Sequence, residues 1–393
     1  MRLLITSHVI HYSYDGRLYA YGPYAREIDQ WADLFAEVEI ASPCRNQAPP
    51  GDCLAFERRN IRILPQKEAG GETVAAKAGL VASIPGMMWG LARAMRRADA
   101  IHVRCPGNLG LIGAVMAPLF SRRIIAKYAA QWNGGDGEPF SARVQRAILG
   151  SRWWKGPVTV YGEWPGSPRH VISFFTSLLA AEQIEAARVS AARERRGPGL
   201  RVLYTGRLSK AKNVDVLLRA VARVRAAGHD VTTRIIGTGP EREVLGLLAA
   251  ELGIASRVEF TGGMAFERVI DSLGESDVLV LASETEGWPK SIAEGMAFGL
   301  ACIGSNVGFV PQMLEGRGFA VTPRDEEGLT AALLRVAESP DRLADMRKAA
   351  ASWAQRYSLE GLREALRALM EEWWGGDTQM TELSAPRMKA ERL

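Results

Sequence analysis

Two glutamates stand eight residues apart in a segment that joins a short apolar run to a helical pattern. The segment reads Glu-Gly-Trp-Pro-Lys-Ser-Ile-Ala-Glu from Glu286 to Glu294. The preceding run, 277–283, is typical of a buried parallel strand, and 290–299 predicts a helix. The unpaired N–H groups at this helix start would face an anion beyond the strand. The spacing therefore predicts a diphosphate there, with Glu286 accepting from sugar hydroxyls and Glu294 from a ribose diol. In the alternative interpretation, Glu286 caps the helix and Glu294 lies on a solvated face.

Two cations earlier in the chain have the chemistry that a diphosphate requires. Arg207 has a planar fork that can bind two phosphate oxygens, and Lys212 supplies a compact point charge. Cations fixed at a departing nucleotide stabilise the charge that develops on it. The alternative is a pair of solvated loop cations. Gly237 and Gly239 permit a close approach of backbones, but the third glycine of a dinucleotide fingerprint is absent.

In their chain order, these motifs resemble those of the family 4 retaining glycosyltransferases (glycosyl transferases group 1), which have the GT-B fold. The resemblance is close over 201–335 and looser in the N-terminal half. It places Glu286 and Glu294 on the two glutamates of the family's Glu-x7-Glu signature. By the resemblance, the catalytic residues are Arg207, Lys212 and Glu286, and the donor-binding residues are Gly206, Gly237, Gly239, Gly287, Trp288, Pro289, Lys290, Ser291 and Glu294.

The resemblance also implies a reaction. A sugar would pass from a nucleotide sugar, a UDP- or GDP-sugar, to a hydroxyl of a glycan or lipid-linked saccharide, with retention and without a cofactor or metal. In agreement with this expectation, the sequence contains no Asp-x-Asp motif. The resemblance also implies a role in the biosynthesis of cell-surface or extracellular polysaccharides. Two alternatives stay open: another GT-B sugar-nucleotide enzyme, an epimerase or a phosphorylase, and a non-catalytic nucleotide-sugar-binding subunit.

The N-terminal half departs more from the family, and it is the half in which acceptor choice is expected. Many members carry His-x-His where this chain has His102-Val-Arg104, so Arg104 either meets an anionic acceptor or sugar, or pairs with a neighbouring acid. The loop from Trp132 to Asp136 combines an aromatic surface, an acid and glycines, and a plain surface turn is its alternative. The residues expected on the acceptor side are His8, Gly16, Gly22, Arg104, Trp132 and Asp136.

The length and the hydrophobic pattern indicate two α/β domains. A chain of 393 residues exceeds the size of a single core. Strand and helix patterns alternate from end to end, which predicts two Rossmann-like, doubly wound domains facing each other across a cleft. The expected parts are an N-terminal acceptor-binding domain at 1–185, a linker at 186–200, a C-terminal donor-binding domain at 201–358, a helix at 359–374 that crosses back to the N-terminal domain, and a disordered tail at 375–393.

The positive charge is concentrated in the N-terminal half. Residues 1–180 contain 21 Lys and Arg against 14 Asp and Glu, whereas the whole chain has a net charge of +5. The segment 78–98 is apolar and then basic, and it predicts a peripheral contact with an anionic membrane, with an ordinary surface helix as the alternative. Nucleic acid is not an expected partner, because the cations are interleaved with acids and no binding motif is present.

Residue patterns also predict a location. Residues 1–8 predict an opening strand rather than a signal peptide, and the longest near-apolar stretch, 109–120, is shorter than the ~20 residues that cross a bilayer. Four cysteines lack metal-ligand spacing and suit a reducing compartment. A cytoplasmic protein is therefore expected, in peripheral contact with the cytoplasmic face of the membrane.

Overall fold

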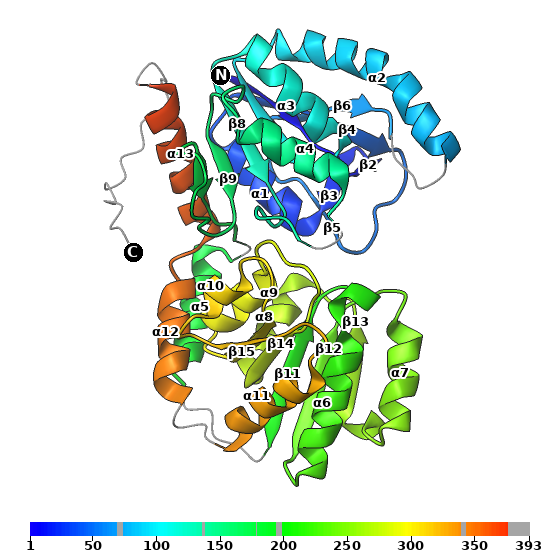
Figure 1. Cartoon of the computed structure of the whole chain (residues 1–393), viewed down its shortest axis with the longest axis vertical. Coiled ribbons are helices and arrows are strands. Elements are labelled where there is room, and N and C mark those ends of the chain that lie inside the picture. The colour runs from blue at the N-terminus through cyan, green and yellow to red at the C-terminus, as the bar shows by residue number, and fades with distance from the viewer. Residues whose placement is uncertain (69–73, 136–137, 178, 194–198, 339–342, 376–393) are drawn as a thin grey trace.

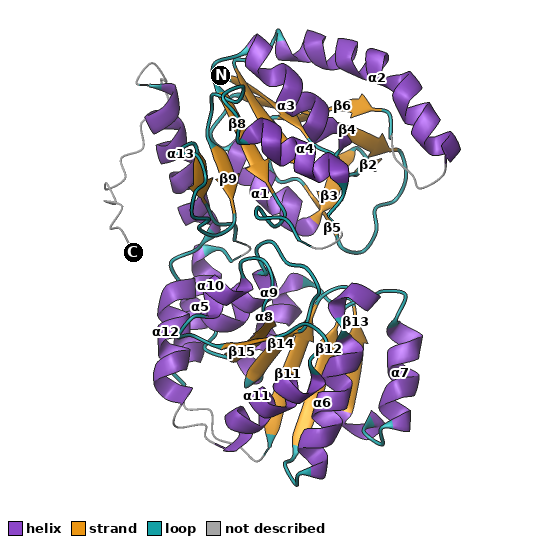
Figure 2. Cartoon of the chain, in the orientation of Figure 1, coloured by secondary structure: helices purple, strands orange, loops and turns teal. Residues whose placement is uncertain are grey.

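A computed structural model of the chain describes residues 1–68, 74–135, 138–177, 179–193, 199–338 and 343–375, with the side chains of 74–83 left aside. Two α/β domains lie one above the other along the long axis (Figure 1). Each is built on its own sheet, with helices against it (Figure 2). Within the described part of the chain, no helix has both the length and the apolar character that a membrane span requires.

The N-terminal sheet has a parallel centre and a hairpin at one side. The strand order is β10-β9-β8-β7-β1-β4-β2-β3-β5, and β6 also pairs with β4. The strands are β1 (Arg2–Thr6), β2 (His11–Tyr14), β3 (Arg17–Tyr21), β4 (Glu37–Arg45), β5 (Cys53–Ala55), β6 (Ile61–Gln66), β7 (Ala100–Cys105), β8 (Ile124–Tyr128), β9 (Val158–Val160) and β10 (Val171–Ser173). The helices are α1 (Gly22–Ala32), α2 (Val74–Met95), α3 (Asn108–Phe120) and α4 (Phe140–Leu149).

The C-terminal sheet is parallel throughout, in the order β13-β12-β11-β14-β15-β16. Its strands are β11 (Leu200–Thr205), β12 (Val231–Ile236), β13 (Val258–Gly262), β14 (Val278–Leu281), β15 (Ala301–Ser305) and β16 (Phe319–Val321). Its helices are α5 (Ala181–Ala191), α6 (Val214–Ala226), α7 (Arg242–Glu251), α8 (Phe266–Glu275), α9 (Lys290–Ala297), α10 (Val310–Leu314), α11 (Glu326–Glu338) and α12 (Ala344–Ala354), with 3-10 turns η1 (Lys210–Lys212) and η2 (Ala255–Arg257).

The strand order explains where the helices lie. From β11 the chain moves outward through α6 and α7, and it then returns to β14, so right-handed crossovers place α8 and α9 on the opposite face. Helix α6 packs on α11, while α9 packs on α5 and α12. The strands have apolar side chains on both faces, as a sheet covered on both sides requires, and β14 is buried along its whole length.

The chain crosses between the domains twice, and the two crossings are joined. The Ser177 hydroxyl donates to the Tyr357 carbonyl at 2.8 Å, and the Leu359 N–H donates to the Leu179 carbonyl at 2.9 Å. After the second crossing, α13 (Leu359–Trp374) packs on α1, burying Leu362 and Leu366. Helix α5 packs on the C-terminal domain, so the first half of the expected linker at 186–200 is helical and docked there.

Candidate active site

The carboxyl ends of the C-terminal strands carry the predicted donor residues. In an open parallel sheet, ligands bind outside these ends, where loops lead into helices. The loops after β11, β12, β14 and β15 meet there and face the N-terminal domain (Figure 1). This edge holds Gly206, Arg207 and Lys212 after β11, Gly237 and Gly239 after β12, and Glu286 to Ser291 after β14.

Glycines let the first two of these loops touch. A Cβ on Gly237 would overlap the Gly206 carbonyl oxygen, and a Cβ on Gly239 would overlap the Leu208 carbonyl oxygen. The Leu208 N–H donates to the Thr238 carbonyl at 2.9 Å, which fixes the contact. The predicted close approach is therefore made to the neighbouring loop, and it holds the segment that carries Arg207.

The structure brings Lys212 and Glu286 together, although 74 residues separate them in the sequence. The Lys212 Nζ atom lies 2.6 Å from Glu286 Oε1. Backbone contacts support the pair: the Glu284 N–H donates to the Ala211 carbonyl at 2.8 Å, and Asn213 Nδ2 donates to the Ala282 carbonyl at 2.9 Å. Glu286 accordingly pairs with a cation rather than capping α9.

Arg207 is held by its backbone while its side chain is exposed. The Tyr204 hydroxyl donates to the Arg207 carbonyl at 3.0 Å. Among the described residues, none accepts a hydrogen bond from the Arg207 guanidinium, which is therefore available to a phosphate.

The loop before α9 is anchored by a buried aromatic ring. The Trp288 side chain is 6% exposed and stacks on Phe309, with ring centroids 5.1 Å apart. Trp353 and Tyr357 also pack against it, as do Tyr161 and Phe175. Pro289 is also buried, directly before the first helical residue, Lys290. The structure thus places the Trp288 and Pro289 side chains in the core, where they position the loop, because a large apolar ring gains most by burial.

Glu294 carries a buried carboxyl group with an unused oxygen. It is 6% exposed, and its Oε1 has no hydrogen-bond partner among the described residues. Burial raises its pKa to about 8, against the opposing effect of Lys290 and Arg26. It borders a cavity of about 10 Å³ together with Lys290 and Trp288, which is room for about one water. A buried polar atom without a partner marks a position prepared for a ligand or a water. Glu294 does not lie on a solvated face.

The N-terminal domain contributes residues that sequence reasoning missed. The Arg26 guanidinium, on α1, lies 4.3 Å from the ring centroid of Phe266 at the start of α8, so it reaches across to the other domain. Tyr21 lies close enough to Asp52, Glu294 and Glu286 that their charges, after burial, raise its pKa. No local pattern in the sequence distinguishes these two side chains from other surface residues.

Arg104 pairs with a neighbouring acid, which was one of the two alternatives. Its Nη1 lies 3.0 Å from Glu27 Oε1, and Lys127 Nζ lies 2.9 Å from Glu27 Oε2. Burial raises the pKa of Glu27, but Arg104 and Lys127 together outweigh it and lower the pKa below its ordinary value. Sequence reasoning missed Glu27 and Lys127. The strand register explains the role of Lys127, because Arg104 on β7 lies directly opposite Lys127 on β8.

The structure gives different positions to the other three residues expected on the acceptor side, His8, Gly16 and Gly22. His8 lies against Gly107, and burial and then Arg104 lower its pKa. Gly16 instead forms the turn of the β2–β3 hairpin, with φ of 68° beside Asp15 at 49°. The Asp-Gly pair is the usual signal of such a turn. Gly22 begins α1 and packs on Leu54.

The expected acceptor loop does not offer an aromatic surface. Trp132 is only 8% exposed, packs edge-on against Tyr128, and its Nε1 donates to Ser167 Oγ at 3.3 Å. The prediction of a stacking residue there is wrong, because the apolar ring is buried under the loop. Asp136 lies outside the described residues.

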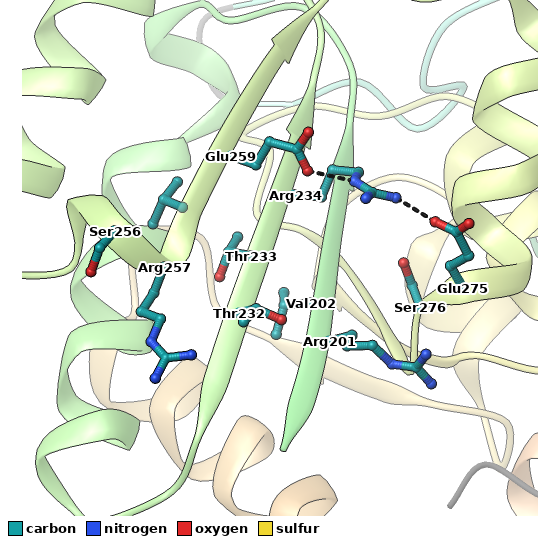
Figure 3. Close-up of a pocket in the computed structure, with 11 residues that line it drawn as sticks. Arg201, Val202, Thr232, Thr233, Arg234, Ser256, Arg257, Glu259, Glu275 and Ser276 are labelled. Atoms are coloured by element: carbon teal, nitrogen blue, oxygen red, sulfur yellow. Dashed lines mark hydrogen bonds and ion pairs between the residues drawn. The ribbon is translucent and has the colours of Figure 1, made fainter. Parts of the chain in front are cut away.

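A larger cavity, of about 420 Å³, lies at the opposite end of the C-terminal strands. It is bordered by Arg201 and Thr232, the second residues of β11 and β12. Arg234 crosses it between Glu259 and Glu275, at 2.8 and 2.7 Å (Figure 3). Because it lies at the amino ends of the strands, it is separate from the edge that carries the donor residues.

The C-terminal domain is similar in sequence to known glycosyltransferases. Residues 189–353 match the family model of the glycosyl transferases group 1. The chain is 32% identical over 174 residues to a D-inositol 3-phosphate glycosyltransferase of Rhodococcus jostii, covering 42% of this chain and 38% of that protein. It is 31% identical over 173 residues to a GDP-mannose-dependent alpha-(1-6)-phosphatidylinositol monomannoside mannosyltransferase of Mycolicibacterium smegmatis, covering 41% and 45%. The matches thus span less than half of each relative's length.

Solved structures are similar over nearly the whole chain. A sucrose-phosphate synthase from Thermosynechococcus elongatus has a TM-score of 0.69 at 18% identity, covering 95% of this chain and 99% of that chain. Anabaena Alr3699/HepE in complex with UDP has a TM-score of 0.68 at 15% identity, covering 95% and 100%. The protein has the GT-B fold, and the predicted fold class is confirmed. The match of residues 189–353 to the glycosyl transferases group 1 agrees with the resemblance seen in the sequence.

Proposed function

We propose that the protein is a retaining, metal-independent glycosyltransferase that moves a sugar from a UDP- or GDP-sugar to a hydroxyl of a glycan or lipid-linked saccharide. The observation that carries the proposal is the Lys212–Glu286 pair at the carboxyl edge of the C-terminal sheet, with Lys212 on the same loop after β11 that carries Arg207. The relatives support it, since one is a GDP-mannose-dependent mannosyltransferase and one structural neighbour was solved in complex with UDP. A role in cell-surface or extracellular polysaccharide assembly is part of the proposal.

The diphosphate would lie between Arg207, Lys212 and the start of α9. Arg207 supplies unoccupied donors, and α9 supplies N–H groups of its first turn. Lys212 is neutralised by Glu286 in the unliganded protein. A diphosphate would compete for Lys212 and leave Glu286 free to accept from sugar hydroxyls. Lys290 and Ser291 follow at the first helical positions, where Lys290 adds a further cation.

Glu294 would bind the ribose. Its unused Oε1 and its raised pKa both indicate a site that lacks a polar partner. A diol satisfies a carboxyl group in either protonation state, because a hydroxyl can donate or accept.

The reaction needs no side-chain nucleophile. The bond between the anomeric carbon and the phosphate oxygen breaks, and the acceptor oxygen bonds to the same face of that carbon. The acceptor's proton passes to the leaving phosphate oxygen. Arg207 and Lys212 would stabilise the phosphate as its negative charge grows, which lowers the barrier more than it strengthens ground-state binding.

The test is transfer in the presence of EDTA. The protein is incubated with UDP-glucose, UDP-N-acetylglucosamine or GDP-mannose and a bacterial glycolipid extract, and the anomeric configuration of the product is read by NMR. Retained configuration without added metal supports the proposal. Inversion, or transfer only on adding Mg²⁺ or Mn²⁺, contradicts it. Turnover of the donor with no acceptor present would indicate an epimerase or another sugar-nucleotide enzyme.

We also propose a peripheral contact with anionic membrane from the cytoplasmic side. On neighbouring helices of the N-terminal domain, Trp89 is 71% exposed and Leu119 is 66% exposed. Arg93 lies 6.0 Å from the Trp89 ring, and Arg96 lies 5.9 Å from the Phe120 ring. Aromatic and basic side chains together suit a lipid interface.

Sedimentation with vesicles tests this contact. We expect the protein to pellet with vesicles of anionic lipid at low salt, and Trp89→Ser to pellet less, with Val244→Ser, a 57% exposed side chain on α7, as the matched control. Equal pelleting of Trp89→Ser and the wild type would contradict the assignment of this surface.

A further inference from the structure

Three charged side chains of the N-terminal domain form a buried cluster with one cation in excess. Glu27 binds Arg104 and Lys127 through its two carboxylate oxygens. The side chains are 3% exposed for Glu27, 11% for Arg104 and 7% for Lys127. One carboxylate therefore neutralises one of two nearly buried cations.

Among the residues that the structure describes, none supplies a second anion to the cluster. His102 lies on the same face of β7 as Arg104, stacks on Trp31 at 4.5 Å, and burial lowers its pKa to about 3, so it is neutral. Tyr24 and Tyr161 present aromatic rings to Arg104 and Lys127, at 5.0 and 5.4 Å. Aromatic faces soften the cost of burying a cation, but they do not cancel its charge.

The guanidinium of Arg104 has donors to spare. Only Nη1 has a protein acceptor among the described residues, and no Arg104 nitrogen is both buried and unpartnered. The remaining N–H groups are therefore at least partly accessible, on a side chain that is 11% exposed. An arginine whose fork is half used can still bind a carboxylate or phosphate.

The cluster lies where it can meet a substrate. Arg104 and Lys127 stand opposite each other near the carboxyl ends of adjacent parallel strands, the edge at which such sheets bind ligands. Tyr161, which covers Lys127, packs on the donor loop: a Cβ on Gly287 would lie 3.0 Å from the Tyr161 ring. The cluster thus borders the donor loop from the N-terminal side.

We propose that Arg104, supported by Lys127 and Glu27, binds an anionic group, a phosphate or a carboxylate, of the acceptor. This inference rests on the proposed function, and it names the acceptor class. Glu27 holds the two cations in place and neutralises one of them. The anion of the acceptor would neutralise the other. Arg104 touches the anion, whereas Glu27 and Lys127 are positioning residues.

Calorimetry tests the proposal with defined probes. UDP and GDP are titrated first, and the one that binds is kept at saturation so that Arg207 and Lys212 are occupied. Glucose 6-phosphate, glucuronate and glucose are then titrated as phosphate, carboxylate and neutral probes. We expect at least one acidic probe to bind tenfold or more tightly than glucose. The affinities of UDP-glucuronate and UDP-glucose are also compared, without any other probe. Tighter binding of UDP-glucuronate would show that Arg104 binds an anionic group of the donor sugar instead.

A variant separates a binding role from a structural one. Arg104→Gln leaves the balanced Glu27–Lys127 pair, so we expect it to fold, to bind the nucleotide like the wild type, and to lose the preference for the acidic probe. Arg104→Lys should keep part of the preference for the acidic probe. Three results would overturn the proposal. The wild type could bind glucose and both acidic probes equally, or Arg104→Gln could keep the full preference for the acidic probe. The wild type could also bind UDP-glucuronate more tightly than UDP-glucose. Failure of the nucleotide to bind would instead count against the proposed function.

Discussion

At the scale of single residues, Glu294 is the most informative side chain of the site. A carboxyl group that is buried without partners keeps its proton to a higher pH than it does in the unfolded chain. Its folded pKa is about 8, compared with an ordinary value of 4.5. Between these values the folded state binds more protons than the unfolded state, so the free energy of unfolding falls as the pH rises.

Glu294→Gln should remove this pH dependence. We expect the wild type to lose stability between about pH 5 and pH 8, with a slope of up to about 1.4 kcal/mol per pH unit, relative to the variant. Urea denaturation of both proteins across this range measures the difference. Parallel stability curves would show that the carboxyl group is already ionised in the folded protein.

Arg207 provides the complementary case, an exposed cation without a structural role. We expect Arg207→Ala to unfold at the temperature of the wild type, within the roughly 0.5 kcal/mol that surface substitutions change. Its affinity for UDP or GDP should fall by about 1.5–3 kcal/mol, the worth of hydrogen bonds to charged groups. Arg219→Ala, an exposed arginine on α6, is the matched control and should bind normally. Equal affinities of the two variants would remove Arg207 from the diphosphate site.

At the scale of elements, the glycine contact between the loops after β11 and β12 holds the diphosphate site. Gly237→Ala places a methyl group against the Gly206 carbonyl, so the loops must separate. We expect a loss of about 1–3 kcal/mol in stability, as for overpacked cores, together with weaker nucleotide binding. Gly228→Ala, at φ of 95° with open space around its Cβ, controls for backbone strain alone. If the two substitutions behave alike in thermal melts and in titrations, the contact is unimportant.

The sequence predicted these elements well where local pattern and packing agree. Strand β14, helix α9 and the glutamates at 286 and 294 lie where the apolar run and the Pro at the helix start place them. Side-chain orientation could not be predicted, because it depends on distant neighbours. Trp288 was expected to bind the donor and Trp132 to offer a stacking surface, and both side chains are buried. The Glu27–Arg104–Lys127 cluster joins three elements, and the strand register brings Arg104 and Lys127 together.

At the scale of the whole molecule, α13 connects the C-terminus to the first domain. It buries Leu362, Leu366 and Leu369 against α1, and Arg363 pairs with Asp33 at 3.1 Å. Leu366→Ala should destabilise the protein by about 2–5 kcal/mol, because it leaves a cavity under a well-packed helix. Denaturation monitored by circular dichroism measures this loss, and Glu371→Ala, an exposed position on the same helix, is its control. A Leu366→Ala variant as stable as the control would show that the docking of α13 contributes little.

The central claim is that nucleotide sugars bind at the carboxyl edge of the C-terminal sheet, between Arg207, Lys212 and Glu294. The most direct test is calorimetric titration of UDP and GDP, with EDTA present, into the wild type, Arg207→Ala and Glu294→Ala. The account predicts that one nucleotide binds the wild type, and that each substitution weakens it tenfold or more without unfolding the protein. Binding that is unchanged in both variants, or no binding of either nucleotide to the wild type, would contradict it.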